Sequence, residues 1–86
     1  MPIVSAFFGI VVRVYHEEHP PPHIHVQYAE FAAVIEIDTG RTLAGRLPRT
    51  AAALVERWRS LHEAELQKAW GTAQNGRIPK RIAPLR

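Results

Sequence analysis

Apolar and β-branched residues in the first half of the chain are arranged as in strands, in short runs or alternating with polar residues. This pattern predicts three strands and a shorter candidate fourth, over residues 10–15, 23–28, 31–38 and 41–45. The first strand begins at the earliest near Phe7, with Gly9 at a bulge or bend. Three consecutive prolines in 16–22 exclude helix and ladder pairing, so this segment is predicted to be a loop.

The second half of the chain changes to a helical period. From Pro48 onward, apolar residues recur mostly at spacings of three and four as far as Trp70. Pro48 suits the first helical position, and the Asn-Gly pair at 75–76 suits a helix end. Ser60 and Glu63 fit a capping box, so the stretch is either one long helix or two short helices that meet near Ser60.

Together these elements predict an α+β fold: a three- to four-stranded antiparallel β-meander covered on one face by one long or two short C-terminal helices. We expect a single domain over residues 1–86, made of a strand-rich half at about 3–45, a helical half at about 48–75 and an extended basic tail at 77–86. Ile78, Ile82 and Leu85 are predicted to pin this tail to the domain while its basic residues face outward.

Hydrophobic burial favours one register for the strands, because a slip by one residue would send the histidines into the core. With a hairpin turn at Ala29 and Glu30, antiparallel pairing opposes Ile24 with Ile35 on an apolar face and leaves His25 on the other face. The same register gathers five polar side chains on the sheet face opposite the helices, namely Arg13, Tyr15, His23, His25 and Glu36.

Composition excludes several classes of protein. Hydrophobic residues make up 47% and charged residues 22% of the chain, which is typical of globular domains and not of disordered or fibrous ones. Cysteine is absent, which excludes disulfide scaffolds, thiolate zinc sites and thiol catalysis. The chain has no apolar run of membrane-spanning length, and its first residues lack the pattern of a signal peptide. We therefore expect a cytoplasmic protein with no membrane partner.

The net charge of +3 is unevenly distributed. Residues 1–40 hold one basic and five acidic residues, whereas residues 41–86 hold ten basic and three acidic ones. A basic C-terminal half suits a nucleic-acid backbone or an acidic protein, although a solvated basic surface without a partner has the same composition. The candidate nucleic-acid contacts are the four cations of the tail, Arg77, Lys80, Arg81 and Arg86.

The polar residues of the outer sheet face allow three interpretations. In the first, the site cleaves RNA without a metal: His23 and His25 act as acid and base, Glu36 orients a histidine, and Arg13 with Tyr15 clamps the phosphate. In the second, the His-x-His pair binds a metal with a loop histidine or Glu36, although Arg13 nearby opposes a cation. In the third, the histidines are structural and bond loop carbonyls or stack on Tyr15. We expect no metal and no cofactor.

A resemblance to a known family extends over residues 2–85. The residues that carry it are 1–5, 8–13, the string His-Pro-Pro-Pro-His-Ile-His-Val at 19–26, Leu47, Pro48, Trp58, Leu61, His62, Glu65, Leu66, Trp70 and 82–85. In these residues the chain resembles the bacterial family known as domain of unknown function 4160, with the proline-flanked His-x-His as the most specific part. Glycines are common at the tip of the second hairpin in that family, where this chain has Ala29 and Glu30.

The resemblance implies a small intracellular protein whose relatives are often encoded beside a second small protein, of the unknown-function family 2442. Such pairs suggest a toxin–antitoxin-like module, in which one member is commonly a nuclease. The leading hypothesis is therefore a component of such a module that binds RNA or DNA, with metal-independent ribonuclease activity as its enzymatic form. The alternative is a non-enzymatic interaction module, antitoxin or regulatory partner, that uses the exposed sheet face or a sheet edge to bind a protein or a second copy.

Overall fold

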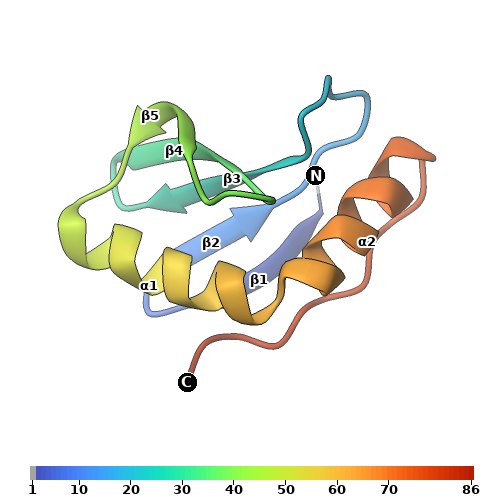
Figure 1. Ribbon diagram of the computed structural model, residues 1–86. Helices are drawn as coiled ribbons and strands as arrows, with labels where there is room; N and C mark the ends of the chain where they lie inside the picture. Colours follow the sequence, from blue (N-terminus) through green and yellow to red (C-terminus); the bar gives the residue numbers. More distant parts are fainter. Residues whose placement is uncertain (1) are drawn as a thin grey trace.

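Five antiparallel strands form one sheet in the order β1-β2-β3-β4-β5, and two helices follow (Figure 1). The structure is a computed structural model and describes residues 2–86. The elements are β1 (Ile3–Phe7), β2 (Ile10–Arg13), β3 (His23–Tyr28), β4 (Phe31–Glu36), β5 (Thr42–Arg46), α1 (Arg49–Leu61) and α2 (Glu63–Gln74). The α+β class and the antiparallel meander are confirmed. The predicted number of strands was wrong, since the sheet has five strands instead of three or four.

The additional strand is β1, which the sequence pattern did not reveal. It pairs with β2 through a two-residue turn at Phe8 and Gly9, whose φ angles of 50° and 79° are both positive. Paired positive φ angles are typical of the tight turns that join antiparallel strands, and glycine adopts them without strain. Gly9 is therefore a turn residue and not a bulge within one longer strand. β2 ends at Arg13, two residues earlier than expected.

The predicted register of the central strands is confirmed. In the β3–β4 ladder Ile24 lies opposite Ile35, and His23 lies opposite Glu36. In the β2–β3 ladder Arg13 lies opposite His25. The hairpin turns at 29–30 as expected, with Ala29 at a positive φ of 51°. Alternation along these strands sends the apolar side chains to the helices and His25 to the opposite face.

The core lies between one face of the sheet and the two helices. Val12, Ile24 and Val26 from the central strands are 2% exposed or less. Trp58 of α1 is the largest fully buried side chain, and the centroid of its ring lies 5.3 Å from the centroid of the Phe7 ring. Burial of this apolar surface is the main force that holds the helices on the sheet. None of the helices in residues 2–86 is long and apolar enough to cross a membrane.

Two helices form instead of one, and the break lies at His62. α1 ends at Leu61 and α2 begins at Glu63, close to the predicted junction at Ser60. The predicted capping box was wrong, because α2 has no side-chain cap and the Ser60 hydroxyl donates to the carbonyl of Arg57 at 2.9 Å. A serine that bonds backward within its own helix is not available to cap the next one.

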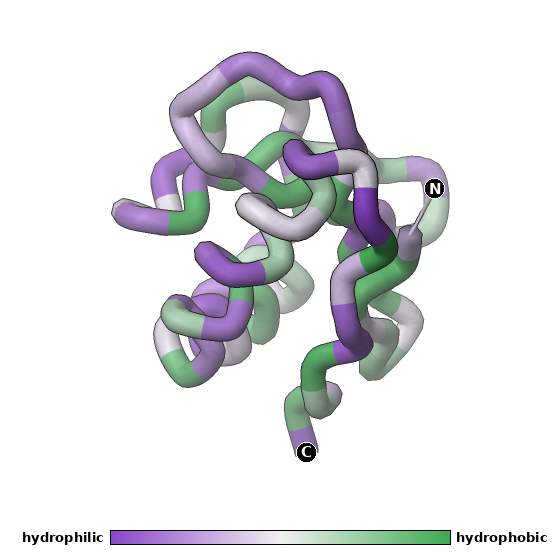
Figure 2. Tube along the Cα trace, turned by 90° about the vertical axis from the view of Figure 1, so that its right-hand side faces the viewer, coloured by the Kyte–Doolittle hydropathy of each residue, from purple (hydrophilic) through white to green (hydrophobic). Residues whose placement is uncertain are grey.

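The C-terminal tail is anchored to the free edge of β1. The N–H of Ile82 donates to the carbonyl of Val4 at 2.7 Å, and the buried Ser5 hydroxyl donates to the Ile82 carbonyl at 3.0 Å. The indole N–H of Trp58 donates to the carbonyl of Ala83 at 2.8 Å. Hydrophobic and hydrophilic residues are interspersed along this segment, whose end is marked C in Figure 2.

The tail residues meet the sequence expectation in part. Ile82 and Leu85 are buried, as predicted. The prediction for Ile78 was wrong, since it is 86% exposed. The reason is that Gly76, at a φ of 75°, ends α2 with a turn, so the chain meets the domain again only at the buried Pro79. At the other edge of the sheet lies β5, and four of its five residues are exposed.

Candidate functional site

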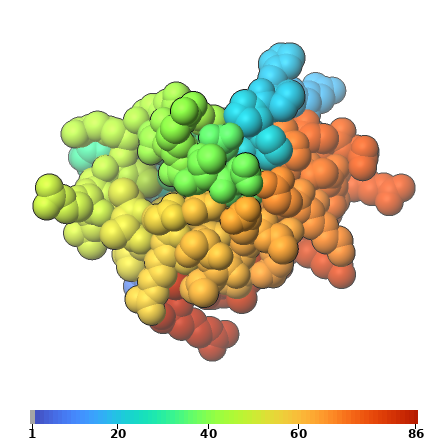
Figure 3. All heavy atoms as spheres, viewed as in Figure 1, coloured from blue at the N-terminus to red at the C-terminus, as the bar shows by residue number. Residues whose placement is uncertain are grey.

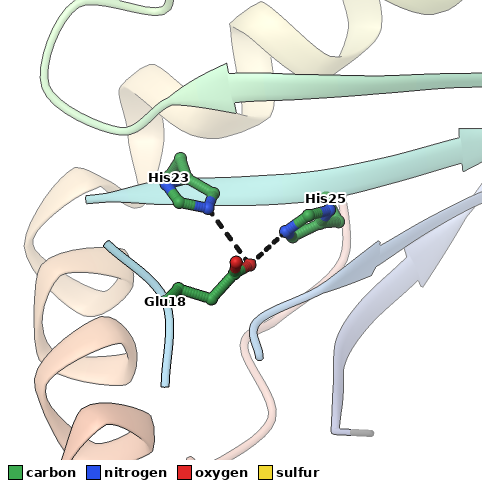
Figure 4. A group of neighbouring side chains, drawn as sticks. All are labelled: Glu18, His23 and His25. Carbon is green, nitrogen blue, oxygen red and sulfur yellow. Dashed lines mark hydrogen bonds and ion pairs between the residues drawn. The ribbon is translucent and has the colours of Figure 1, made fainter. Parts of the chain in front are cut away.

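Two histidines of β3 converge on one carboxylate from the loop before that strand (Figure 4). Oε1 of Glu18 lies 3.1 Å from Nε2 of His23 and is also hydrogen-bonded to Nε2 of His25. The two histidines are separated by one residue of the strand, so their side chains project from the same side of the sheet. We call Glu18, His23 and His25 the His–Glu cluster.

His23 is held in one orientation by its second ring nitrogen. Nδ1 lies 2.8 Å from the carbonyl oxygen of Pro21, and because a carbonyl oxygen can only accept, Nδ1 carries the proton of this bond. The ring also packs against Trp70 of α2, with 4.9 Å between centroids, and the residue is only 8% exposed. Nε2 of His23 is therefore aimed at Glu18 by contacts on the opposite side of the ring.

One side chain of α2 fixes the loop that carries Glu18. Gln74 donates from Nε2 to the carbonyl of Tyr15 at 2.9 Å and accepts the N–H of Glu18 at Oε1 at 3.0 Å. In Figure 3 this loop, in light blue, packs against the orange end of α2. Glu18 thus lies in a loop, outside the strands and helices, but helix α2 fixes the position of its backbone.

The Glu18 carboxyl is ionised in this setting. Burial raises its pKa, but the hydrogen bonds and charges of His25 and His23 lower it by more, so the pKa of Glu18 lies below its usual value. The side chains of Glu18 and His25 are 27% and 31% exposed, against 10% for His23. Solvent therefore reaches the cluster from the side of Glu18 and His25.

A shallow depression of about 310 Å³ lies beside the cluster on the sheet face opposite the helices. We call it the outer depression. Its polar lining includes His25 and Tyr15, whose rings meet edge to face with 4.4 Å between centroids. Small apolar side chains complete the lining, from Ala32, Val34 and Ala44. The depression combines one accessible imidazole with an apolar floor.

The predicted catalytic residues are only partly brought together. His23 and His25 share the cluster, and the ring of Tyr15 contacts that of His25. The Nη1 atom of Arg13 donates to the side-chain oxygen of Gln27 at 3.1 Å, so the guanidinium is directed toward Gln27. This places Arg13 on the correct face but engages it with a neighbouring amide.

The carboxylate partner of the histidines is Glu18 and not the predicted Glu36. Glu36 does lie opposite His23 in the ladder, but its carboxylate accepts a hydrogen bond from the Thr39 hydroxyl at 2.7 Å. Sequence reasoning missed Glu18 because its position depends on how a proline-rich loop folds back. It also missed Gln74, which lies 56 residues further along the chain. No spacing rule connects these residues.

The cluster has the chemistry of a metal-ligand set. Each of its three residues offers one ligand atom, and these atoms all lie within 4.8 Å of one another. Imidazole nitrogens with a carboxylate oxygen are ligands that zinc and related divalent transition metals accept. Glu18, His23 and His25 are thus the residues that could hold such an ion.

The predicted nucleic-acid contacts lie on the anchored tail. Arg77, Lys80, Arg81 and Arg86 are all exposed. Lys80 and Arg81, together with Lys68 and Thr72 of α2, line a groove of about 340 Å³ between the helix and the tail, which we call the tail groove. One acidic residue, Glu65, also belongs to its lining. The groove therefore has a positive balance.

Comparison with protein families agrees with the resemblance seen in the sequence. The family described as domain of unknown function (DUF4160) matches residues 9–71. This range includes the entire His–Glu cluster and ends before the basic tail. No curated protein and no solved structure matches the chain.

Proposed function

The chain belongs to the DUF4160 family, and from that premise we propose that it is a nucleic-acid-binding component of a toxin–antitoxin-like module. The gene arrangement of relatives motivates the module, and the charge of the C-terminal half motivates the ligand. The proposal assigns nucleic-acid contact to the tail cations Arg77, Lys80, Arg81 and Arg86 and to Lys68 of the tail groove.

The observation that carries this proposal is that the cations lie on a fixed segment. Ile82 is hydrogen-bonded to Val4 and Ser5, and Ala83 is hydrogen-bonded to Trp58. Lys80 and Arg81 therefore extend from a backbone that is already ordered. Binding a phosphate backbone then costs side-chain freedom but little backbone freedom. The exposed Ile78 beside them offers an apolar contact to a sugar or base.

Salt dependence of binding tests the proposal. Fluorescence anisotropy would measure the affinity of the full chain for labelled single-stranded RNA, single-stranded DNA and duplex DNA at several salt concentrations. Each phosphate neutralised contributes about −0.9 to the slope of log K against log salt for duplex DNA and about −0.7 for single strands. We expect a slope corresponding to about five phosphates for the favoured ligand, one for each assigned cation.

Two quadruple variants, which lower the net charge by the same amount, test which cations matter. In the tail variant Arg77, Lys80, Arg81 and Arg86 are replaced by Gln, which should flatten the slope and weaken binding at least about tenfold. In the control variant Arg41, Arg46, Arg49 and Arg57, which are exposed elsewhere, are replaced by Gln. Equal loss in both variants would mean that only net charge matters, and the tail assignment would be rejected.

The geometry supports binding better than metal-independent cleavage. Cleavage by two histidines requires an acid and a base that both reach the substrate. His23 is nearly buried and has both ring nitrogens engaged, so only His25 is accessible. Ribonuclease activity stays a prediction, with His25 in contact with RNA and His23 as a positioning residue.

Growth of cells that express this chain separates the two activities. If the tail binds nucleic acid and this binding is toxic, the fourfold tail variant should relieve growth arrest. If cleavage is the toxic activity, the His23→Ala/His25→Ala variant should relieve it and RNA from the arrested cells should be cut. Both variants must be expressed at the level of the parent for the comparison to hold.

A second candidate function is a protein-interaction module centred on the outer depression. The observation that favours it is the lining, since Ala32, Val34 and Ala44 form an apolar floor beside the polar Arg13 and His25. An apolar centre with a polar rim is typical of protein interfaces. If this chain has a small protein partner encoded nearby, as the family resemblance implies, Arg13→Ala or His25→Ala should weaken that complex, as measured by size-exclusion chromatography of the co-expressed pair.

A further inference from the structure

We propose that the His–Glu cluster, formed by Glu18, His23 and His25, binds one divalent transition-metal ion of the zinc class. This inference does not depend on nucleic-acid binding, and it departs from the sequence expectation that the chain binds no metal. It rests on the convergence of three ligand atoms and on the contacts that hold the cluster in place.

The ligand atoms have the spacing that a small cation needs. Metal–nitrogen and metal–oxygen bonds to zinc are about 2.0–2.2 Å long, so ligand atoms around one ion lie about 3–4 Å apart. Nε2 of His23 and Oε1 of Glu18 are 3.1 Å apart, and all three ligand atoms lie within 4.8 Å of one another. A small rotation of the Glu18 side chain would open room for the ion between the three atoms.

The hydrogen bond to Pro21 fixes which ring nitrogen of His23 faces the cluster. Nδ1 already donates its proton to the Pro21 carbonyl, so a neutral His23 presents the lone pair of Nε2 to the Glu18 carboxylate. A nitrogen lone pair that faces a carboxylate oxygen at this distance is how two ligand atoms of one metal ion are arranged. A metal ion at this point would be coordinated by His23, His25 and Glu18 together.

The contacts behind the ligands resemble those of established metal sites. A ligating histidine in a metal site usually donates its other ring N–H to a carbonyl or carboxylate, as His23 does to Pro21. Trp70 and Tyr15 pack against the two imidazole rings, and Gln74 holds the backbone of Glu18. The ligands therefore need little rearrangement to bind an ion.

The guanidinium of Arg13 is directed away from the ligand atoms of the cluster, to a neighbouring amide. Arg13 lies opposite His25 in the ladder, but its guanidinium is directed to the side-chain oxygen of Gln27. The side chain of Glu18 is 27% exposed and contributes a carboxylate oxygen to the cluster. Three protein ligands leave one position of a tetrahedral ion free for water or an anion, on the exposed side of His25.

Calorimetric titration of the EDTA-treated full chain with ZnCl₂, in the absence of nucleic acid, tests the inference. We expect one ion per chain, and Co²⁺ in its place should give a visible absorption band of a four- or five-coordinate ion. Glu18→Gln and His25→Ala should abolish measurable binding. The matched controls are Glu17→Gln and His19→Ala, which alter the same loop outside the cluster and should bind as the parent does.

A measurement on the parent protein alone guards against variants that fail to fold. Two-dimensional ¹H–¹⁵N spectra of the histidine rings should show that zinc shifts Nε2 of His23 and of His25 but leaves the rings of His16, His19 and His62 unchanged. The inference is overturned if the parent binds no zinc, if the shifts fall on the other histidines, or if the control variants lose binding equally. Because nucleic acid is absent, none of these results bears on the function proposed above.

Discussion

The side-chain oxygen of Gln74 accepts the backbone N–H of Glu18 at 3.0 Å, although the two residues lie 56 positions apart in the sequence. The same side chain donates to the carbonyl of Tyr15. The end of α2 thereby determines where the loop before β3 presents its carboxylate. The His–Glu cluster is a tertiary arrangement built by a helix, a loop and a strand.

This relationship predicts that Gln74→Ala weakens metal binding without removing a ligand. Loss of contacts behind the ligands typically reduces metal affinity about 10–100-fold. We therefore expect calorimetry with ZnCl₂ to show a reduction in this range, with one ion still bound per chain. Gln67→Ala, on the same helix, is the control and should bind as the parent does. Unchanged zinc affinity in Gln74→Ala would show that the loop holds its position without α2.

A second prediction concerns the buried Arg59. Its guanidinium donates to the carbonyl of Ile37 at 2.7 Å and to both carboxylate oxygens of Glu56. The hydrogen bonds from Arg59 lower the pKa of Glu56 by more than burial raises it. A carboxyl whose pKa is lowered by folding stabilises the protein above its unfolded-state pKa, and this contribution is lost as the pH falls through its folded-state pKa.

Glu56→Gln should therefore lower the free energy of unfolding by about 1 kcal/mol at pH 7, a value that allows for solvent screening of the half-exposed Glu56. The difference from the parent should shrink steadily as the pH is lowered from 5 toward 2. Urea unfolding at several pH values measures this. Glu30→Gln, in the exposed turn before β4, is the control. A difference that persists undiminished at pH 2 would contradict the assignment.

A third prediction compares two glycines with similar backbone angles. Gly45 and Gly76 have φ values of 71° and 75°. A Cβ on Gly45 would lie 2.2 Å from the carbonyl oxygen of Ala32, whereas a Cβ on Gly76 would meet nothing within 4 Å. Gly76→Ala should therefore cost only the left-handed backbone strain, about 1–2 kcal/mol. Gly45→Ala should cost clearly more, because the β4–β5 ladder must also shift.

Thermal or urea unfolding of the two glycine variants measures the difference between them. Equal free energies of unfolding would mean that β5 moves away from Ala32 at no cost. β5 would then contribute little to the stability of the sheet.

A fourth prediction tests the anchor of the tail. The buried hydroxyl of Ser5 donates to the carbonyl of Ile82, and Ser5→Ala should cost about 1 kcal/mol because that carbonyl loses a partner. Hydrogen exchange should also become faster at the amide of Ile82. Ser60→Ala removes an exposed hydroxyl bonded to Arg57 and should change the stability by less than about 0.5 kcal/mol. If exchange at Ile82 stays the same, Ser5 does not anchor the tail.

The sequence predicted those features that depend on local pattern. Alternation along 23–28 and 31–36 placed β3 and β4 in register, because a slip would have put histidine instead of isoleucine on the face that packs against the helices. The helical half followed from apolar spacing in the same way. β1 was missed because its run of Ile-Val-Ser-Ala-Phe has no clear alternation, and because the turn at Phe8 and Gly9 resembles an irregularity within one strand.

The candidate site could be predicted only as far as the strands reach. His23 and His25 were identified because they share β3. Glu18 could not be identified, because a carboxylate in a proline-rich loop has no register, and its position depends on a hydrogen bond to Gln74. The strand register predicted Glu36 instead, because it lies opposite His23 in the ladder. That backbone pairing is correct, but the Glu36 carboxylate accepts a hydrogen bond from the Thr39 hydroxyl and not from His23.

The most direct test of the proposed function is an NMR titration of the ¹⁵N-labelled chain with a short single-stranded RNA and with a duplex DNA. The proposal predicts that the largest amide shifts fall on the tail at 77–86 and on α2 around Lys68, with small changes at the outer depression. Shifts centred on His25 and Gln27, or no shifts with either nucleic acid at low salt, would contradict it.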